Sequence, residues 1–214
     1  MMKKVILALD VCNFKQAERL IKKTSPYIDI YKVGPILFIQ SGKKIIKMIK
    51  ENGKEVFLDL KFHDIPNTVK RSVESARDLG VFSLTVHSAG GEEMLEGAIS
   101  VEKRPKIWAV SILTSQIVDL DEVIKKSKIS KSCGLDGVIS SPLEVKFIKK
   151  ECGKEFSVVT PGIRFEKCYD DQKRVATPKV AIKNGADFII IGRPVLESKD
   201  PVKVLKDIYK SIKI

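Results

Sequence analysis

The chain has 214 residues, of which 43% are hydrophobic, and its 39 basic and 27 acidic side chains give a formal net charge of +12. This length suits one large domain, and the apolar content excludes an intrinsically disordered chain. No apolar stretch approaches the roughly 18 residues that mark a membrane span, and charges interrupt the N-terminal segment too early for a secretory signal. We therefore expect a cytoplasmic protein that does not act at a membrane.

Short apolar segments alternate with amphipathic segments along the whole chain. The apolar segments have the length of buried strands, and glycines and prolines separate them from their neighbours. Strands are predicted at 5–10, 30–34, 56–61, 82–87, 107–113, 137–140, 157–160 and 188–192. Between them, helix-spaced apolar pairs such as Ala17 with Ile21 and Val69 with Val73 predict amphipathic helices.

Eight strand–helix units, averaging about 27 residues each, favour an α/β fold with a single (β/α)8 TIM barrel over residues 1–214. A doubly wound open sheet would show the same alternation. However, the first predicted strand is followed by Val11, Cys12 and Asn13, so the G-x-G-x-x-G loop of dinucleotide-binding sheets is missing. No change of composition marks a second domain.

The cysteines and lysines exclude two further classes. The four cysteines lie far apart, with no C-x-x-C pair, so we predict no zinc site and no other metal site. Only seven of the basic residues are Arg, and the lysines are spread along the helical segments without interleaved aromatic residues. This pattern argues against nucleic-acid binding, whereas a positive field would attract a phosphorylated substrate.

Charged residues end three of the predicted strands. Because side chains alternate across a strand, Asp10, Lys32, Asp59 and Lys61 lie on the face opposite the fully apolar one. The apolar face packs under the helices, so the charged face points into the barrel, at the carboxyl ends where barrel active sites are built. A buried ion-pair network without chemistry would stabilise the fold poorly, because desolvation offsets the attraction. These four charges therefore predict a functional site.

The most specific string in the chain is D-L-K-F-H-D-I-P-N-T at 59–68. Shorter motifs accompany it before and after this string. In chain order they lie at 9–10, 31–34, 85–87, 110–115, 160–164, 171–172 and 191–194. With these landmarks the chain resembles the orotidine 5′-phosphate decarboxylase family nearly end to end. The resemblance implies a cofactor-free homodimeric barrel that converts orotidine 5′-monophosphate to UMP and CO2, the last step of de novo pyrimidine nucleotide biosynthesis.

The resemblance also assigns roles by matching position. Lys61 is the implied proton donor to C6 of the pyrimidine, Asp59 lies against the departing carboxylate, and Lys32 and Asp10 contact the sugar. A fixed ammonium stabilises the carbanion that forms at C6. Repulsion between the Asp59 carboxylate and a substrate carboxylate about 4 Å away amounts to about 4 kcal/mol at an effective dielectric near 20. Enzymes typically lower an activation barrier by roughly 8–23 kcal/mol, so this repulsion supplies only part of the effect. We therefore assign the larger effect to Lys61.

Phosphate binding is predicted at the end of the last strand. Gly192 permits close approach of the backbone, and Arg193 supplies several hydrogen-bond donors, in the region where barrels often bind phosphate. The long polar segment 162–177 is a predicted mobile lid. Within it, the resemblance implies that Gln172 grips the phosphate and places Arg164 in the matching loop.

Four more residues complete the predicted site. Thr114 matches a hydroxyl that contacts the pyrimidine amide, and Pro161 belongs to the substrate-binding segment. Asp64 and Thr68 match residues that reach into the neighbouring subunit's site, which implies sites shared across a homodimer interface. Asp64 follows the end of its strand, where it is poorly placed to serve its own barrel.

Two alternatives remain. A Mg²⁺-dependent sugar-phosphate decarboxylase or aldolase of the same barrel superfamily shares D-x-K-x-x-D but carries an acidic metal ligand near the position of Lys32, and an ammonium there would weaken Mg²⁺ binding. A basic RNA-binding module would show steep salt dependence and no catalysis. His63 is a further candidate acid, but Lys61 already supplies a proton, so a structural role for His63 is favoured.

Overall fold

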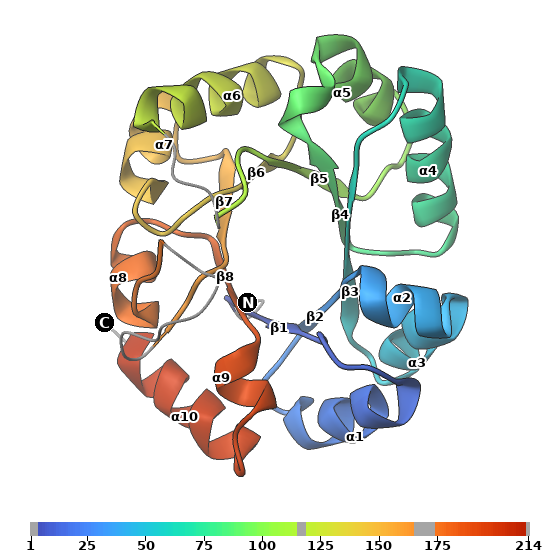
Figure 1. Cartoon of the computed structure of the whole chain (residues 1–214), viewed down its shortest axis with the longest axis vertical. Coiled ribbons are helices and arrows are strands. Elements are labelled where there is room, and N and C mark those ends of the chain that lie inside the picture. Colours follow the sequence, from blue (N-terminus) through green and yellow to red (C-terminus); the bar gives the residue numbers. More distant parts are fainter. Residues whose placement is uncertain (1–3, 115–118, 165–173, 213–214) are drawn as a thin grey trace.

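Eight parallel strands close into a barrel in which each strand pairs with the next in chain order and β8 pairs with β1 (Figure 1). The computed structural model describes residues 4–114, 119–164 and 174–212. The strands are β1 Val5–Ala8, β2 Ile30–Val33, β3 Glu55–Phe62, β4 Ser83–His87, β5 Lys106–Val110, β6 Gly137–Ile139, β7 Ser157–Thr160 and β8 Phe188–Ile191. The predicted (β/α)8 barrel is confirmed.

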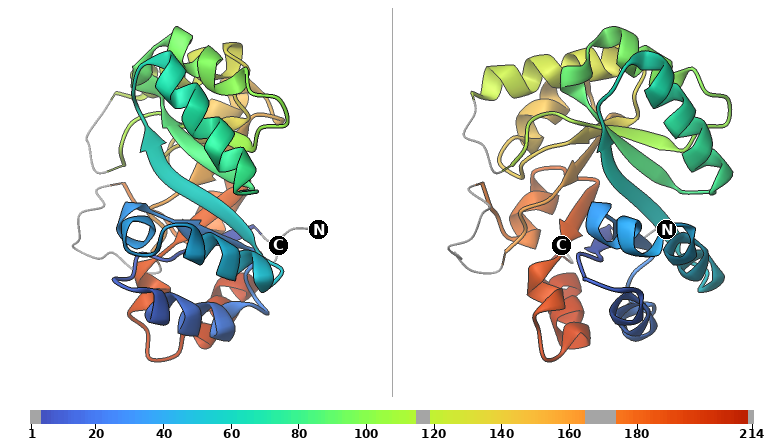
Figure 2. Two further views of the ribbon diagram at one scale, coloured as in Figure 1. Left: turned by 90° about the vertical axis from the view of Figure 1, so that its right-hand side faces the viewer. Right: turned by 45° about the vertical axis from the view of Figure 1, so that its right-hand side comes forward.

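Helices surround the strands on the outside of the barrel (Figures 1 and 2). They are α1 Phe14–Thr24, α2 Pro35–Ser41, α3 Lys43–Glu51, α4 Pro66–Asp78, η1 Ser88–Gly90, α5 Glu92–Ile99, α6 Leu120–Ser132, α7 Val145–Cys152, α8 Pro178–Lys183, α9 Arg193–Leu196 and α10 Pro201–Ile212. The hydroxyl of Tyr209 on α10 donates to the carbonyl oxygen of Tyr27, after α1, at 2.7 Å. In the parts of the chain that the structure describes, no helix is long and apolar enough to cross a membrane.

Several predicted strands extend too far at their carboxyl ends. The largest error is the prediction for 107–113, since β5 ends at Val110. Beyond this point the chain leaves the sheet, and the Ser88 hydroxyl bonds the carbonyl oxygens of Val110 and Ser111 at 2.8 and 3.0 Å. Apolar residues continue past the end of β5 because they line a cavity, and an apolar run does not distinguish a cavity wall from a strand.

Two apolar layers follow the predicted alternation of side chains. Val5, Leu7 and Leu9 belong to the large core under the helices. A second cluster fills the barrel and consists of Ile6, Ala8, Ile30, Phe57, Trp108, Val110, Ile139, Val159 and Ile190. Trp108 is fully buried in it, with its ring centroid 4.8 Å from that of Phe57 in an edge-on contact. This plug closes the barrel below the charged strand ends.

Local signals explain where the two predicted helices begin. The side-chain oxygen of Asn13 accepts a hydrogen bond from the Gln16 N–H at 3.0 Å and so caps α1. Helix α4 begins at Pro66, whose fixed φ suits the first helical turn, and it buries Val69 and Val73 as predicted. Both helices therefore start where capping chemistry and the apolar face agree.

A buried ion pair joins the loops at the carboxyl end of the barrel. Glu144 follows β6, is 6% exposed, pairs with Arg174 and accepts hydrogen bonds from the Ser140 hydroxyl and the Ser141 N–H. Arg174 also donates to the carbonyl oxygen of Leu113 at 3.2 Å. The pair therefore ties Arg174, which precedes α8, to the loops after β5 and β6. Neither partner of this pair is predicted from the sequence to have a role.

The substitution Glu144→Gln tests how much this pair stabilises the fold. It keeps the shape of the side chain but leaves the Arg174 guanidinium buried without its counter-ion. Since breaking a buried pair is strongly unfavourable, we expect the free energy of unfolding to fall by about 3–5 kcal/mol in urea titrations followed by circular dichroism.

The matched control is Glu151→Gln on α7, which removes a carboxylate from an exposed pair with Lys128. Exposed pairs contribute little to stability, so the denaturation midpoint of this variant should stay near that of the wild type. Equal shifts in the two variants would contradict the assigned role of Glu144.

Candidate active site

A cavity of about 600 Å³ opens at the carboxyl ends of the strands. This volume is typical of sites for small molecules. The predicted site residues that line it are Asp10, Lys32, Asp59, Lys61, Thr114, Pro161, Arg164, Gly192 and Arg193. Residues of β2 and β3 and of the segments that follow β1, β5, β7 and β8 therefore meet in one space, as the predicted barrel mouth requires.

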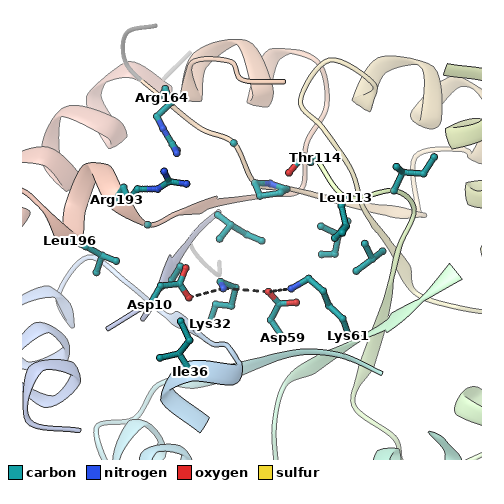
Figure 3. A pocket seen from close by; sticks show the side chains of 18 of the residues that line it. Asp10, Lys32, Ile36, Asp59, Lys61, Leu113, Thr114, Arg164, Arg193 and Leu196 are labelled. Carbon is teal, nitrogen blue, oxygen red and sulfur yellow. Dashed lines mark hydrogen bonds and ion pairs between the residues drawn. The ribbon is translucent and has the colours of Figure 1, made fainter. Parts of the chain in front are cut away.

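Four charges form a row along one wall of the cavity, with signs that alternate (Figure 3). The Lys61 ammonium lies 2.9 Å from Oδ2 of Asp59, and the Lys32 ammonium lies 3.3 Å from the same oxygen. Lys32 also donates to Oδ1 of Asp10 at 3.0 Å. The order Asp10, Lys32, Asp59, Lys61 gives each of the two middle residues a partner on both sides.

The two middle residues of the row are buried, with Lys32 at 9% and Asp59 at 7% exposure. Burial alone would raise the pKa of Asp59, but the ammonium groups of Lys32 and Lys61 and the hydrogen bonds outweigh it and hold that pKa below its ordinary value. Burial alone would lower the pKa of Lys32, but the carboxylates of Asp59 and Asp10 raise it. Both groups are therefore charged at neutral pH.

The backbone at Lys61 adopts an unusual conformation. Its φ is +51°, a left-handed value that costs a non-glycine residue roughly 1–2 kcal/mol. The register of β3 against β4 shifts between Leu58 and Phe62, so Lys61 lies within an irregularity of the ladder. Such irregularities re-aim side chains, and here the Lys61 side chain points along the charged row into the cavity (Figure 3).

Two arginines lie at the end of the cavity away from Lys61 (Figure 3). Arg193 begins α9 directly after β8, and Arg164 follows β7 (Figure 3). Arg164 is only 8% exposed, and its Nη1 donates to the Ile163 carbonyl oxygen at 2.9 Å. Guanidinium groups bind phosphate through several hydrogen bonds, so this end of the cavity suits a phosphate group.

The structure does not bring every predicted residue to the cavity of its own chain. Asp64 and Thr68 are both exposed and do not line it, and Oδ1 of Asp64 accepts the Ile65 N–H at 2.7 Å. Gln172 lies outside the described residues, as does much of the predicted lid at 162–177. For these residues the predicted roles stay predictions.

One polar residue next to the charged row is not among the site residues predicted from the sequence. The Thr85 hydroxyl donates to Oδ1 of Asp59 at 3.0 Å and accepts the N–H of Lys61 at 2.9 Å. Alternation along β4 places Thr85 on the inner face, beside the charged end of β3, and this pattern could have identified it. Ile36 and Leu196 also line the cavity, but the sequence does not indicate this, because apolar residues of these types are typical of an ordinary core.

The chain is similar to known proteins over nearly its full length. The family described as "Orotidine 5'-phosphate decarboxylase / HUMPS family" matches residues 3–208. A protein of Trichlorobacter lovleyi named orotidine 5'-phosphate decarboxylase is 40% identical over 228 residues, covering 98% of this chain and 95% of the relative. One of the same name from Haemophilus ducreyi is 42% identical over 227 residues, covering 98% of each chain.

Solved structures show the same relationship. The crystal structure of orotidine 5'-phosphate decarboxylase from Lactobacillus acidophilus has a TM-score of 0.85 at 36% identity, covering 99% of this chain and 100% of that one. An uncharacterized conserved protein from Geobacillus kaustophilus has a TM-score of 0.84 at 34% identity, covering 98% and 100%. Since both the family match and the relatives extend over nearly the whole sequence, the chain belongs to the orotidine 5'-phosphate decarboxylase / HUMPS family.

Proposed function

We propose that this protein decarboxylates orotidine 5′-monophosphate to UMP and CO2, the last step of de novo pyrimidine nucleotide biosynthesis, without a cofactor. The observation that carries the proposal is the alternating row Asp10–Lys32–Asp59–Lys61 in a cavity whose other end holds two arginines. The names of the relatives, at about 40% identity over nearly the full chain, support the same reaction.

Lys61 is the proposed proton donor. When the bond from C6 to the carboxylate breaks, CO2 leaves and the electron pair stays on C6. The Lys61 ammonium stabilises this charge as it develops and then transfers a proton to C6, which leaves a neutral amine that regains a proton from solvent. Asp59 holds the ammonium at 2.9 Å, so the donor is in position before the reaction begins.

Asp59 has a second proposed effect, on the departing carboxylate. Its lowered pKa keeps it anionic, so it repels a substrate carboxylate placed beside it. At about 4 Å and an effective dielectric near 20 this repulsion is about 4 kcal/mol, only part of the roughly 8–23 kcal/mol that enzymes supply. Orientation of Lys61 is therefore the larger proposed contribution of Asp59.

The remaining cavity residues are proposed to bind the rest of the nucleotide. Asp10 and Lys32 contact the ribose, and Arg164 and Arg193 bind the phosphate. Thr114 contacts the pyrimidine. Figure 3 places the arginines apart from Lys61, so phosphate binding orders the substrate at a distance from the reacting carbon.

The rest of the predicted binding set continues this arrangement. Pro161 and Gly192 line the cavity beside the proposed pyrimidine and phosphate positions. Gln172, in the predicted lid at 162–177, is proposed to hold the phosphate from above. Closure of such a lid would exclude water from the reacting carbon.

The active form is proposed to be a homodimer with shared sites. Asp64 and Thr68 lie at the junction of β3 and α4, exposed and outside the cavity of their own chain. Ile65 between them is 66% exposed, a large apolar side chain beside the two polar ones. These features support a role for Asp64 and Thr68 in the site of a second copy.

The Mg²⁺-dependent sugar-phosphate enzymes of the superfamily are the less favoured alternative. The Lys32 ammonium contacts both Asp10 and Asp59, and a cation there competes with Mg²⁺ for the carboxylates. Within the ranges that the structure describes, no three or more His, Cys, Asp or Glu side chains gather in a way that could hold a metal ion. The contacts of Lys32 with both carboxylates favour the decarboxylase over the Mg²⁺-dependent enzymes.

The neighbouring histidines are less suited than Lys61 to give the proton. His63 and His87 stack with ring centroids 5.4 Å apart, and neither lines the cavity. Burial, followed by the charge on His63, lowers the pKa of His87, which therefore carries no proton to donate as an imidazolium at neutral pH. The position of His63 outside the cavity supports the structural role expected for it.

Lys61→Ala tests the donor. We expect kcat for orotidine 5′-monophosphate to fall at least about 10³-fold, because the variant loses both charge stabilisation and proton transfer. The loss of substrate ultraviolet absorbance in EDTA measures this. Lys103→Ala is the matched control, since Lys103 also has a positive φ, of 52°, but lies in an exposed turn before β5.

The outcomes separate the parts of the proposal. Full activity of Lys61→Ala would overturn the donor assignment. No conversion by folded wild-type protein would overturn the reaction itself, and Mg²⁺ assays with sugar phosphates would follow.

Mixing two inactive variants tests the shared site. Asp59→Ala and Asp64→Ala each disable both sites of their own homodimer, but a mixed dimer holds one site with Asp59 and Asp64 both intact. After subunit exchange at equal concentrations we expect about a quarter of wild-type activity to return. If exchange is shown by mass spectrometry of differently tagged subunits and no activity returns, Asp64 does not act across an interface.

A further inference from the structure

Thr85 lies in the middle of β4 with no exposed surface, directly behind the charged row. Its hydroxyl has one proton and two lone pairs. The proton goes to Oδ1 of Asp59 at 3.0 Å, and a lone pair accepts the backbone N–H of Lys61 at 2.9 Å. One oxygen atom therefore contacts both residues to which the reaction chemistry is assigned.

The contact with Lys61 lies where the pairing of β3 with β4 is irregular. Leu58 pairs with Leu84 and Phe62 pairs with Val86. Between these two pairs the chain advances by four residues along β3 but by only two along β4. Lys61 lies inside this irregularity, and its N–H bonds the Thr85 side chain in place of the backbone of β4. A buried N–H without a partner is unfavourable, so the hydroxyl supports the left-handed backbone of Lys61.

The contact with Asp59 fixes which carboxylate oxygen faces the lysines. Oδ2 receives both ammonium groups, from Lys61 at 2.9 Å and Lys32 at 3.3 Å, while Oδ1 receives Thr85. The torsion of a carboxylate about its last bond is soft. A hydrogen bond on Oδ1 removes this freedom and holds Oδ2 toward the cavity.

We propose that Thr85 is a positioning residue of the decarboxylation, whose hydroxyl sets both the backbone of Lys61 and the carboxylate of Asp59 and so aims the Lys61 ammonium at the reacting carbon. Thr85 does not line the cavity, so it acts only through these two residues. The inference rests on the proposed function of Lys61 and Asp59.

Ser83 offers a comparison on the same strand face. It lies two residues before Thr85, is fully buried, and its hydroxyl has no hydrogen-bond partner within the described portions of the chain. A buried hydroxyl on the inner face of β4 therefore does not form hydrogen bonds merely because of its position. The distinctive feature of Thr85 is what its oxygen contacts.

Substitutions at Thr85 test the role of its oxygen. Thr85→Val keeps the shape and removes the hydroxyl. Thr85→Ser and Thr85→Ala form a second pair that differs only by the hydroxyl and stays informative if the valine variant fails to fold. Ser83→Ala controls for loss of a buried hydroxyl from the same strand, and thermal unfolding identifies folded variants.

We expect a change in kcat rather than in KM. Thr85→Val and Thr85→Ala should lower kcat by about 10- to 100-fold, since small misplacements of reacting groups have effects of this size. KM for orotidine 5′-monophosphate should change little, because the phosphate end is untouched. Thr85→Ser should restore most of kcat, and Ser83→Ala should behave as the wild type.

The pH profile separates positioning from simple packing. The Thr85 hydrogen bond is one of the contacts that lower the pKa of Asp59. Its loss raises that pKa, so Asp59 becomes protonated at a higher pH and the acid limb of kcat should move to higher pH in Thr85→Ala. The limb should not move in Ser83→Ala or Thr85→Ser.

Two results would overturn the inference. One is equal kcat for the serine and alanine variants at residue 85, and the other is an unshifted acid limb in Thr85→Ala. Lys61→Ala is assayed in parallel. If that variant is inactive while Thr85→Val and Thr85→Ala are fully active, only the role of Thr85 fails. If Lys61→Ala is active, the proposed function of Lys61 fails first.

Discussion

The buried carboxylate of Asp59 is the group on which the rest of the site depends. Removing a carboxylate from water is costly, and it stays ionised here because the ammonium groups of Lys32 and Lys61 and the Thr85 hydroxyl contact its two oxygens. The lysines in turn need the carboxylate, since Lys32 is nearly as buried. The charges therefore hold one another in place before any substrate binds, which is the arrangement that electrostatic catalysis requires.

The barrel supplies what this cluster needs. Parallel strands bring their carboxyl ends to one rim, and the apolar plug around Trp108 and Phe57 keeps water out from below. The irregularity between β3 and β4 places Lys61 in a left-handed conformation that an isolated strand would avoid. Backbone strain is found at functional sites when the surrounding structure compensates for it. In this protein the Thr85 hydroxyl is part of that compensation.

The loops extend this organisation away from the reacting carbon. Arg164 and Arg193 give the cavity a cationic end, on the side away from Lys61 (Figure 3). The pair of Glu144 and Arg174 ties the C-terminal part of the predicted lid segment 162–177 to the loop that carries Leu113. Binding energy gained at a remote group can be used to order the site only if the connecting loops are held in place. The buried ion pair provides such a connection.

The sequence by itself determined the barrel, the inner position of Asp10, Lys32, Asp59 and Lys61, and the family, because period-two alternation and the string at 59–68 are local properties of the chain. Only the tertiary structure decided the two hydrogen bonds of Thr85, the left-handed backbone of Lys61 and the pairing of Glu144 with Arg174. The two hydrogen bonds and the ion pair join residues that are 24 to 30 positions apart in the sequence. They depend on strand register and loop path, which side-chain alternation does not encode.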